Sequence, residues 1–342
     1  MPTCPKTLND LIIPQVLQQT NEDKKFLQYD SGPGTDRLLI FATDQNLRML
    51  SRGKNWFADG TFKTCPSLFL QLYTIHSIEG TNTIPVVYAL MTARTEHWYL
   101  QLLRKIKEFI PEAEPKWVMT DFEIPAIHAF KRAFIGIKTR GCFFHFSQSI
   151  YRKIHDVKEL RERYNIDGDY QYHLRKLTAL AFVPSSEVPT FFEQLVETEF
   201  YQQNLAEILP LLDYFEDNWI GRKFPGSSNR RKPRFPIELW NVYDSVKLRI
   251  PRTNNSVESW HRSFSSLLQC AKPSIWKFIA AIQQDETLSR YKLAQLSQGN
   301  QTCKKLSRQI AAERLENIVN NQDHYTNDDY ISAVARNIFM PV

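Results

Sequence analysis

The spacing of apolar positions between residues 55 and 150 alternates between strand and helix patterns. Helical spacing recurs in TEHWYLQLLRKIKEFI and EIPAIHAFKRAF. Runs of strand type, rich in β-branched and aromatic residues, are NWFADGTF, SLFLQLYTIHSI, TIPVVYALMT, KWVMTD and KTRGCFFHF. A Gly/Asn turn, EGTN at 79–82, joins the second and third runs and indicates an antiparallel hairpin. This order predicts an α/β fold with a mixed five-stranded sheet and helices packed on it.

The rest of the chain has mostly helical spacing. Segments such as SQSIYRKIHDVKELRERY and LAEILPLLDYFEDNWI carry apolar residues at i, i+3 and i+4, and NNSVESWHRSFSSLL resumes the pattern. We therefore expect four parts, in chain order. They are an N-terminal lead-in at 1–50, a β-rich core at 51–150, a helical insertion at 151–250, and a C-terminal helical part of the core with a tail at 251–342.

Two aspartates stand where predicted strands end. Asp59 is followed by Gly60, which allows another group to approach closely, and Asp121 follows the apolar run 117–119. If the first and fourth strands are neighbours, the two carboxylates face each other and repel unless a divalent cation lies between them. Carboxylates that hold a pair of such cations are what cleavage and transfer of phosphodiesters require. The pattern therefore predicts an Mg²⁺ or Mn²⁺ site, with two ions.

A third carboxylate is expected from the helix that begins near residue 255. Glu258 lies in its first turn, and Asn254, Asn255 or Ser256 is expected to cap it. Val257, Trp260 and Phe264 supply an apolar face that can pack on the sheet, whereas Glu238 and Asp244 remain rivals for the third place.

Composition narrows the class of protein. The chain has 342 residues, a net charge of +6, and no uninterrupted apolar run long enough to span a membrane. It lacks a secretory signal and any Cys-x-x-Cys pair, so we expect a protein of the nucleus or cytosol that is not secreted. The cysteines are Cys4, Cys65, Cys142, Cys270 and Cys303.

A basic loop at 222–234 interrupts the helical region with Pro, Gly and Ser. Its basic residues, which no acidic residue accompanies, are Arg222, Lys223, Arg230, Arg231, Lys232 and Arg234. Such residues are candidates for DNA phosphate contacts, and a solvated loop is the equal alternative.

Six segments in this order resemble the Mutator-like (MULE) transposases. They are WFADGTFK, LYTIH, PVVYALM, DFE, GCFFHF and TNNSVESWH, within roughly residues 38–290. The resemblance implies an RNase H-like sheet with a helical insertion before the catalytic Glu. It also implies a DDE triad for DNA cleavage and strand transfer, which falls on Asp59, Asp121 and Glu258. The Cys-x-x-His element of the family falls on Cys142 and His145, which we expect beside the triad. Two visible ligands are too few for a structural zinc.

The resemblance makes DNA the expected partner and leaves a homo-oligomer open. We expect the family's N-terminal Cys/His module to be missing from this sequence, because Cys4 has no nearby ligand set. The alternative to an active transposase core is therefore a catalytically silent or truncated transposase-derived DNA-binding protein of the nucleus. An RNase H-type enzyme for RNA–DNA hybrids is less consistent with the long helical insertion.

Overall fold

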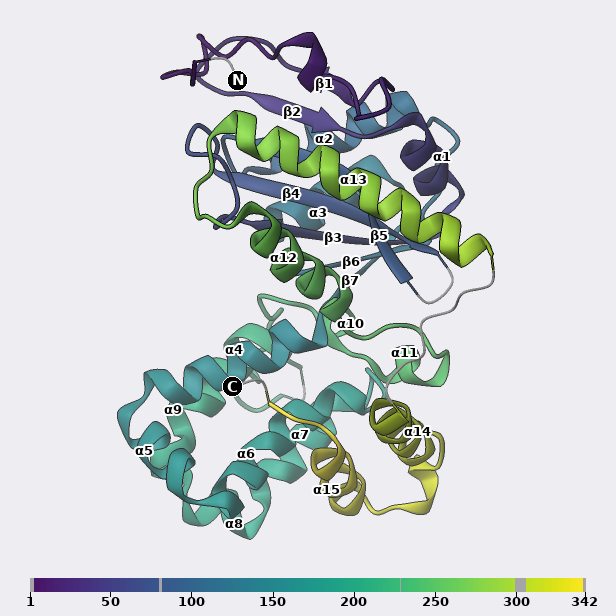
Figure 1. Cartoon of the computed structure of the whole chain (residues 1–342). Coiled ribbons are helices and arrows are strands. Elements are labelled where there is room, and N and C mark those ends of the chain that lie inside the picture. The colour runs from purple at the N-terminus through teal and green to yellow at the C-terminus, as the bar shows by residue number, and fades with distance from the viewer. Residues whose placement is uncertain (1–2, 80–81, 228, 299–305, 341–342) are drawn as a thin grey trace. The chain divides into compact units, whose positions relative to one another are not determined.

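The computed structural model describes residues 3–79, 82–227, 229–298 and 306–340 (Figure 1). The chain divides into two compact units. The sheet unit comprises Met1–Thr139 and Asn254–Thr302, and the helical unit comprises Arg140–Thr253 and Cys303–Val342. Among the described residues, no helix combines the length and apolar character needed to cross a membrane.

A mixed seven-stranded sheet organises the sheet unit, in the order β1-β2-β5-β4-β3-β6-β7. The strands are β1 (Leu27–Asp30), β2 (Leu38–Phe41), β3 (Asn55–Thr61), β4 (Gln71–Glu79), β5 (Asn82–Met91), β6 (Trp117–Thr120) and β7 (Lys138–Gly141). Strands β4 and β5 form the predicted antiparallel hairpin, and residues 80–81 of its turn lie outside the described residues. Strand β3 pairs antiparallel with β4 on one side and parallel with β6 on the other.

Helices cover both faces of this sheet (Figure 1). They are α1 (Asp44–Arg52), α2 (Glu96–Phe109), α3 (Ile124–Ala133), α12 (Asn255–Leu268) and α13 (Ile275–Ser297). Helices α1, α2 and α3 share one apolar core with the sheet, whereas α12 and α13 share another on the opposite face. The central strand β4 is buried from Gln71 to Ser77 because both faces are covered.

The helical unit holds the remaining helices. They are α4 (Phe143–Asp156), α5 (Lys158–Ile166), α6 (Gly168–Ala179), α7 (Val188–Glu197), α8 (Glu199–Gln203), α9 (Leu205–Phe215), α10 (Ile237–Trp240), α11 (Tyr243–Lys247), α14 (Leu306–Asn320) and α15 (Asn327–Asn337). Aromatic rings fill its interior, where Phe146 stacks on Trp240 with ring centroids 4.7 Å apart. Helix α15 joins α6 through an ion pair between Lys176 Nζ and Asp328 Oδ1 at 2.9 Å.

The structure corrects two predictions about the sheet. It has seven strands rather than five, because the expected lead-in contributes β1 and β2 to one edge. The expected fifth strand, KTRGCFFHF, ends at Gly141, and α4 begins at Phe143. Phe143, Phe146 and Ile150 are buried at helical spacing, so the aromatic run belongs to a helix face.

The grouping into units also differs from the expected segments. The residues from Cys303 onward group with the helical unit rather than with the sheet.

Candidate active site in the sheet unit

The parallel pairing of β3 and β6 brings two acidic residues together. Phe57 pairs with Met119 in this ladder, and continuing the register by two residues sets Asp121 beside Asp59. Neighbouring strands lie about 4.8 Å apart, so the two carboxylates lie close together. Both belong to the edge of the sheet that is formed by the carboxyl ends of β3 and β6. The sequence pattern placed these two residues at strand ends, and the observed pairing explains why they interact.

The Asp59 carboxylate is held by groups from β3 and α12. Its Oδ1 accepts a hydrogen bond from the Gly60 backbone N–H at 2.9 Å, and its Oδ2 accepts one from Asn254 Nδ2 at 3.1 Å. His261 Nε2 lies 3.5 Å from Oδ2. Asp59 is only 6% exposed, so these contacts replace most of the water that an aspartate normally has.

Close packing against β4 explains why residue 60 is a glycine. An added Cβ would lie 3.0 Å from Oε1 of Gln71, which is fully buried on the adjacent β4. A side chain there would crowd the strand that carries Asp59.

Burial raises the pKa of Asp121 to about 7. The negative charges of Asp59 and Glu123 add to this shift, whereas the backbone N–H of Glu123 and the guanidinium of Arg94 oppose it. The N–H of Glu123 donates to Asp121 Oδ1 at 3.3 Å, as expected for an acid that precedes a helix. The chain alone therefore pays a free-energy penalty for holding Asp59 and Asp121 ionised together.

Glu123 is neutralised by Arg94. The guanidinium Nε donates to Oε1 at 2.9 Å, and the second nitrogen lies 2.9 Å from Oε2, which makes a bidentate pair. Arg94 also lies over the Phe62 ring, 4.7 Å from its centroid. This pairing gives Glu123, which is not one of the three predicted ligands, a cationic partner of its own.

Glu258 lies in the first turn of α12, as predicted. Burial raises its pKa, and the charge of Asp59 raises it further, whereas Arg262 and His261 lower it. The interaction with Asp59 shows that Glu258 is within electrostatic reach of the sheet edge. Among the described residues, the carboxylate oxygens of Asp59, Asp121 and Glu258 do not all lie within 4.8 Å of one another.

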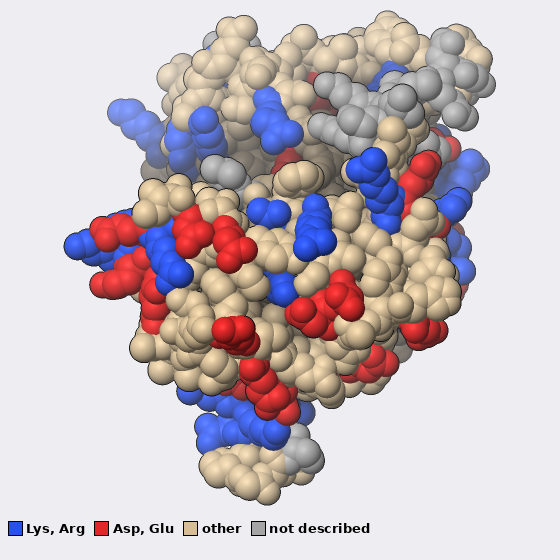
Figure 2. Space-filling model, turned by 90° about the horizontal axis from the view of Figure 1, so that it is seen from below, with Lys and Arg blue, Asp and Glu red and all other residues tan. Residues whose placement is uncertain are grey.

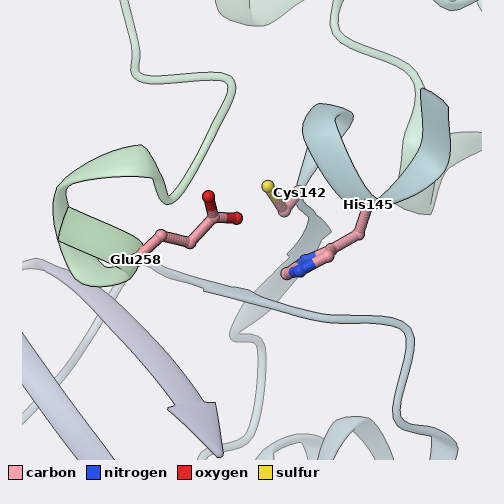
Figure 3. A group of neighbouring side chains, drawn as sticks. All are labelled: Cys142, His145 and Glu258. Carbon is pink, nitrogen blue, oxygen red and sulfur yellow. The ribbon is translucent and has the colours of Figure 1, made fainter. Parts of the chain in front are cut away.

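The expected companions of the triad come from the helical unit. Cys142 directly precedes α4 and is buried, and His145 lies in the first turn of that helix (Figure 3). Figure 3 also draws Glu258, which projects from the first turn of α12. The rival acids Glu238 and Asp244 lie in the first turns of α10 and α11 in the helical unit. The role of Cys142 and His145 stays a prediction.

Two contacts of Asp59 were not predicted from the sequence. Asn254 was expected only as a helix cap, but its side chain makes no capping hydrogen bond and instead reaches Asp59. His261 was not among the predicted site residues, although it lies next to Asp59. The sequence offered one sign of the contact made by Asn254, which is the pair of asparagines at 254–255. One residue suffices to cap a helix, so the second asparagine was free for another role.

The basic loop divides into two groups of cations. Three are paired with acids of the helical unit: Arg222 with Asp217, Lys223 with Glu193, and Arg230 with Glu193 and Glu216. We call the other three, which are exposed, the exposed loop cations: Arg231, Lys232 and Arg234. Lys223 and Arg230 also form an isolated β-bridge, and Ser228 lies outside the described residues.

Charges of both signs are mixed on the face shown in Figure 2. Because three of the six loop cations have acidic partners, about half of the loop's positive charge is compensated within the protein.

Comparison with known proteins identifies one domain. The model of the MULE transposase domain matches residues 55–149, which include Asp59, Asp121, Cys142 and His145. This match confirms the family resemblance over that range and supports a transposase-derived protein. No curated protein matches the chain.

A solved structure described as the Drosophila P element transposase strand transfer complex is 10% identical, with a TM-score of 0.28, and the alignment covers 86% of this chain and 80% of that one. A TM-score this low does not establish a common fold.

Proposed function

We propose that this chain is the catalytic core of a MULE-type DNA transposase, in which Asp59, Asp121 and Glu258 hold divalent metal ions for cleavage and strand transfer of DNA. The observation that carries the proposal is the electrostatic coupling of these three acids in one unit. Asp59 raises the pKa of both Asp121 and Glu258, and two of the three acids lie in the range that matches the MULE transposase domain.

The donor set suits Mg²⁺ or Mn²⁺. These cations prefer oxygen ligands, and the three residues offer carboxylates whose mutual repulsion a cation would relieve. Asp121 is the clearest sign of this need, because its pKa of about 7 leaves it partly protonated at neutral pH in the chain alone. When bound, divalent ions would supply activation of the attacking oxygen and stabilisation of the leaving oxygen.

The surrounding residues prepare the carboxylates. The Gly60 N–H and the Asn254 amide donate hydrogen bonds to the two oxygens of Asp59 and fix the orientation of its carboxylate. Arg94 holds Glu123 in a bidentate pair, which limits the negative charge next to Asp121. Loss of the proton from Asp121 then leaves three carboxylates available at the sheet edge.

DNA is the proposed substrate. The exposed loop cations of the helical unit are suited to contact phosphates, which would hold the duplex without reading its sequence. This role is restricted to those three residues, because the other cations of the loop already have acidic partners.

The direct test is Mg²⁺- or Mn²⁺-dependent nicking of supercoiled plasmid. We expect the wild-type chain to nick, and Asp59→Asn, Asp121→Asn and Glu258→Gln each to abolish nicking while the far-UV circular dichroism spectrum is retained. Glu238→Gln is the matched control, since it removes a rival acid of the helical unit and should leave nicking intact.

Each other result has a defined meaning. A folded wild-type chain that does not nick would favour the catalytically silent, transposase-derived DNA-binding protein. Nicking that survives Glu258→Gln and is lost in Glu238→Gln would move the third ligand to Glu238. Selective cleavage of RNA–DNA hybrids would favour the RNase H-type alternative.

A further inference from the structure

A carboxylate is buried in the apolar layer between α12, α13 and the sheet. Asp285 of α13 is 8% exposed. Its Oδ2 accepts a hydrogen bond from the Tyr88 hydroxyl of β5 at 2.6 Å and one from Trp260 Nε1 of α12 at 3.0 Å. The surrounding core is made of side chains such as Phe264 and Phe278.

Such a group is not needed for packing. Burial raises the pKa of Asp285, which means that its ionised form is disfavoured where it lies. Buried polar groups can often be replaced by apolar residues without loss of stability, and their best-attested use is to select one arrangement among similar ones. A hydrogen bond has a required direction, whereas apolar contacts alone tolerate small rotations of a helix.

The contact to Trp260 restricts the rotation of α12. The indole ring stacks on Phe264 with centroids 5.0 Å apart and meets the His76 ring edge-on at 5.2 Å. Trp260 is two residues after Glu258, so the two side chains share one rigid helical turn. Each residue of an α-helix turns by about 100°, and a slip of one position would carry the Glu258 carboxylate away from the sheet edge.

The same cluster reaches the strand that carries Asp59. His76 Nε2 lies 2.9 Å from the Thr74 hydroxyl, and this hydroxyl donates to the backbone carbonyl of Asp59 at 3.4 Å. The position of helix α12 is therefore fixed against β5 by the hydrogen bonds through Asp285 and against β4 by the ring contact of Trp260 with His76.

We propose that Asp285 is a positioning residue for the metal site, because its hydrogen bonds to Trp260 and Tyr88 fix the rotation of α12 and thereby the position of Glu258. The inference rests on the proposed function only for the role of Glu258 as a metal ligand. It requires no chemistry at Asp285 itself.

The test combines Asp285→Leu, Asp285→Asn and Trp260→Phe in the full chain. Asp285→Leu removes the acceptor, Trp260→Phe removes the indole donor together with part of the ring, and Asp285→Asn retains one acceptor oxygen. Ile106→Val, in the core on the opposite face of the sheet, is the control for a mild loss of packing. Two quantities are measured: amide hydrogen exchange of residues 255–261 and the affinity for Mn²⁺ by isothermal titration.

We expect exchange at 255–261 to accelerate in Asp285→Leu and Trp260→Phe, with α2 unchanged. We also expect Mn²⁺ binding to weaken by about 10- to 100-fold, as is typical when a residue that orients a metal ligand is removed. Asp285→Asn should retain more of both properties than Asp285→Leu, and Ile106→Val should change neither at this helix.

Unchanged exchange at 255–261 would overturn the proposal, and so would faster exchange without any loss of Mn²⁺ affinity. A wild-type chain that does not bind Mn²⁺ would instead contradict the proposed function. Hydrogen exchange would then decide by itself whether Asp285 anchors α12, so the two failures are distinguishable.

Discussion

Asn254 provides a sharp test of how the Asp59 carboxylate is held. Its side chain is completely buried, and Nδ2 donates to Asp59 Oδ2 at 3.1 Å. A hydrogen bond to a charged group contributes about 1.5–3 kcal/mol. The same side chain makes no capping hydrogen bond, so Asn254→Ala should lose the contribution of the bond to Asp59 without uncapping α12. We expect about 2 kcal/mol lower free energy of unfolding for the metal-free chain.

Asn254→Asp should add a dependence on pH. The introduced carboxyl replaces a donor with an acid that faces Asp59, so the folded-state pKa of one of the two acids must rise. Stability conferred by the protonated form is fully present below about pH 4, the usual pKa of an unfolded aspartate, and is lost as pH increases through the raised pKa. The variant should therefore lie close to the wild type at about pH 4 and fall below Asn254→Ala at about pH 8.

Urea unfolding followed by circular dichroism, with a chelator present, measures both effects. Asn255→Ala and Asn255→Asp are matched controls, because Asn255 is the next residue along and is exposed. The reasoning is refuted if Asn254→Asp is as stable as the wild type at about pH 8, or if Asn255→Asp shows the same pH dependence.

Three further results are expected. Folding raises the pKa of Asp121 from 3.8 to about 7, so the metal-free chain loses stability as pH rises between these two values, and Asp121→Asn should weaken the fall in melting temperature between about pH 5 and pH 7. An equally steep fall in the variant would contradict this. Replacing the exposed loop cations with Gln should lower the slope of log K for DNA against log salt by about 2–3 in filter-binding titrations, whereas an unchanged slope would exclude their phosphate contacts. The thiol of Cys65 is buried with a pKa raised to about 12 and that of Cys4 is exposed, so Cys4→Ser should slow the reaction of the native chain with a thiol reagent more than Cys65→Ser does.

The central strands and the positions of the acids were predictable from local pattern. Strand runs alternate with helical runs between residues 55 and 141, and the hairpin of β4 and β5 follows from a short turn between two apolar runs. Asp59 and Asp121 each follow an apolar run, and this position alone suggested that they meet. Their adjacency depends on the parallel pairing of β3 with β6, which the sequence pattern assumed and the structure supplies.

The sheet edges and the start of α4 were harder to predict. Strand β1 is four residues long, too short for a periodic signal to separate it from a loop, whereas β2 lies in RLLIFATDQNLRML, whose first part is of strand type but which the predicted five-stranded sheet did not include. The segment GCFFHF joins a strand to a helix within two residues, and a run of aromatics fits either element until the later positions Ile150 and Ile154 reveal helical spacing.

The long-range polar contacts could hardly be predicted from the local sequence pattern. Asn254 lies 195 residues from Asp59 along the chain, and Trp260 lies 25 residues from Asp285. Local pattern could suggest that Asn254 caps a helix, because capping is the common use of Asn at that place. It could not reveal that the side chain turns toward a strand, since tertiary packing decides between the two acceptors.

These contacts explain how Glu258 stays near Asp59 without a cation. The charge of Asp59 raises the pKa of Glu258, so electrostatics favours separation of the two acids when both are ionised. Asn254 counters this at the start of α12 by joining it to Asp59, and Asp285 counters it through Trp260 by fixing the rotation of the helix. A site whose ligands are held in place despite their repulsion gains affinity for a divalent cation, because the free energy of bringing the charges together has already been supplied by folding.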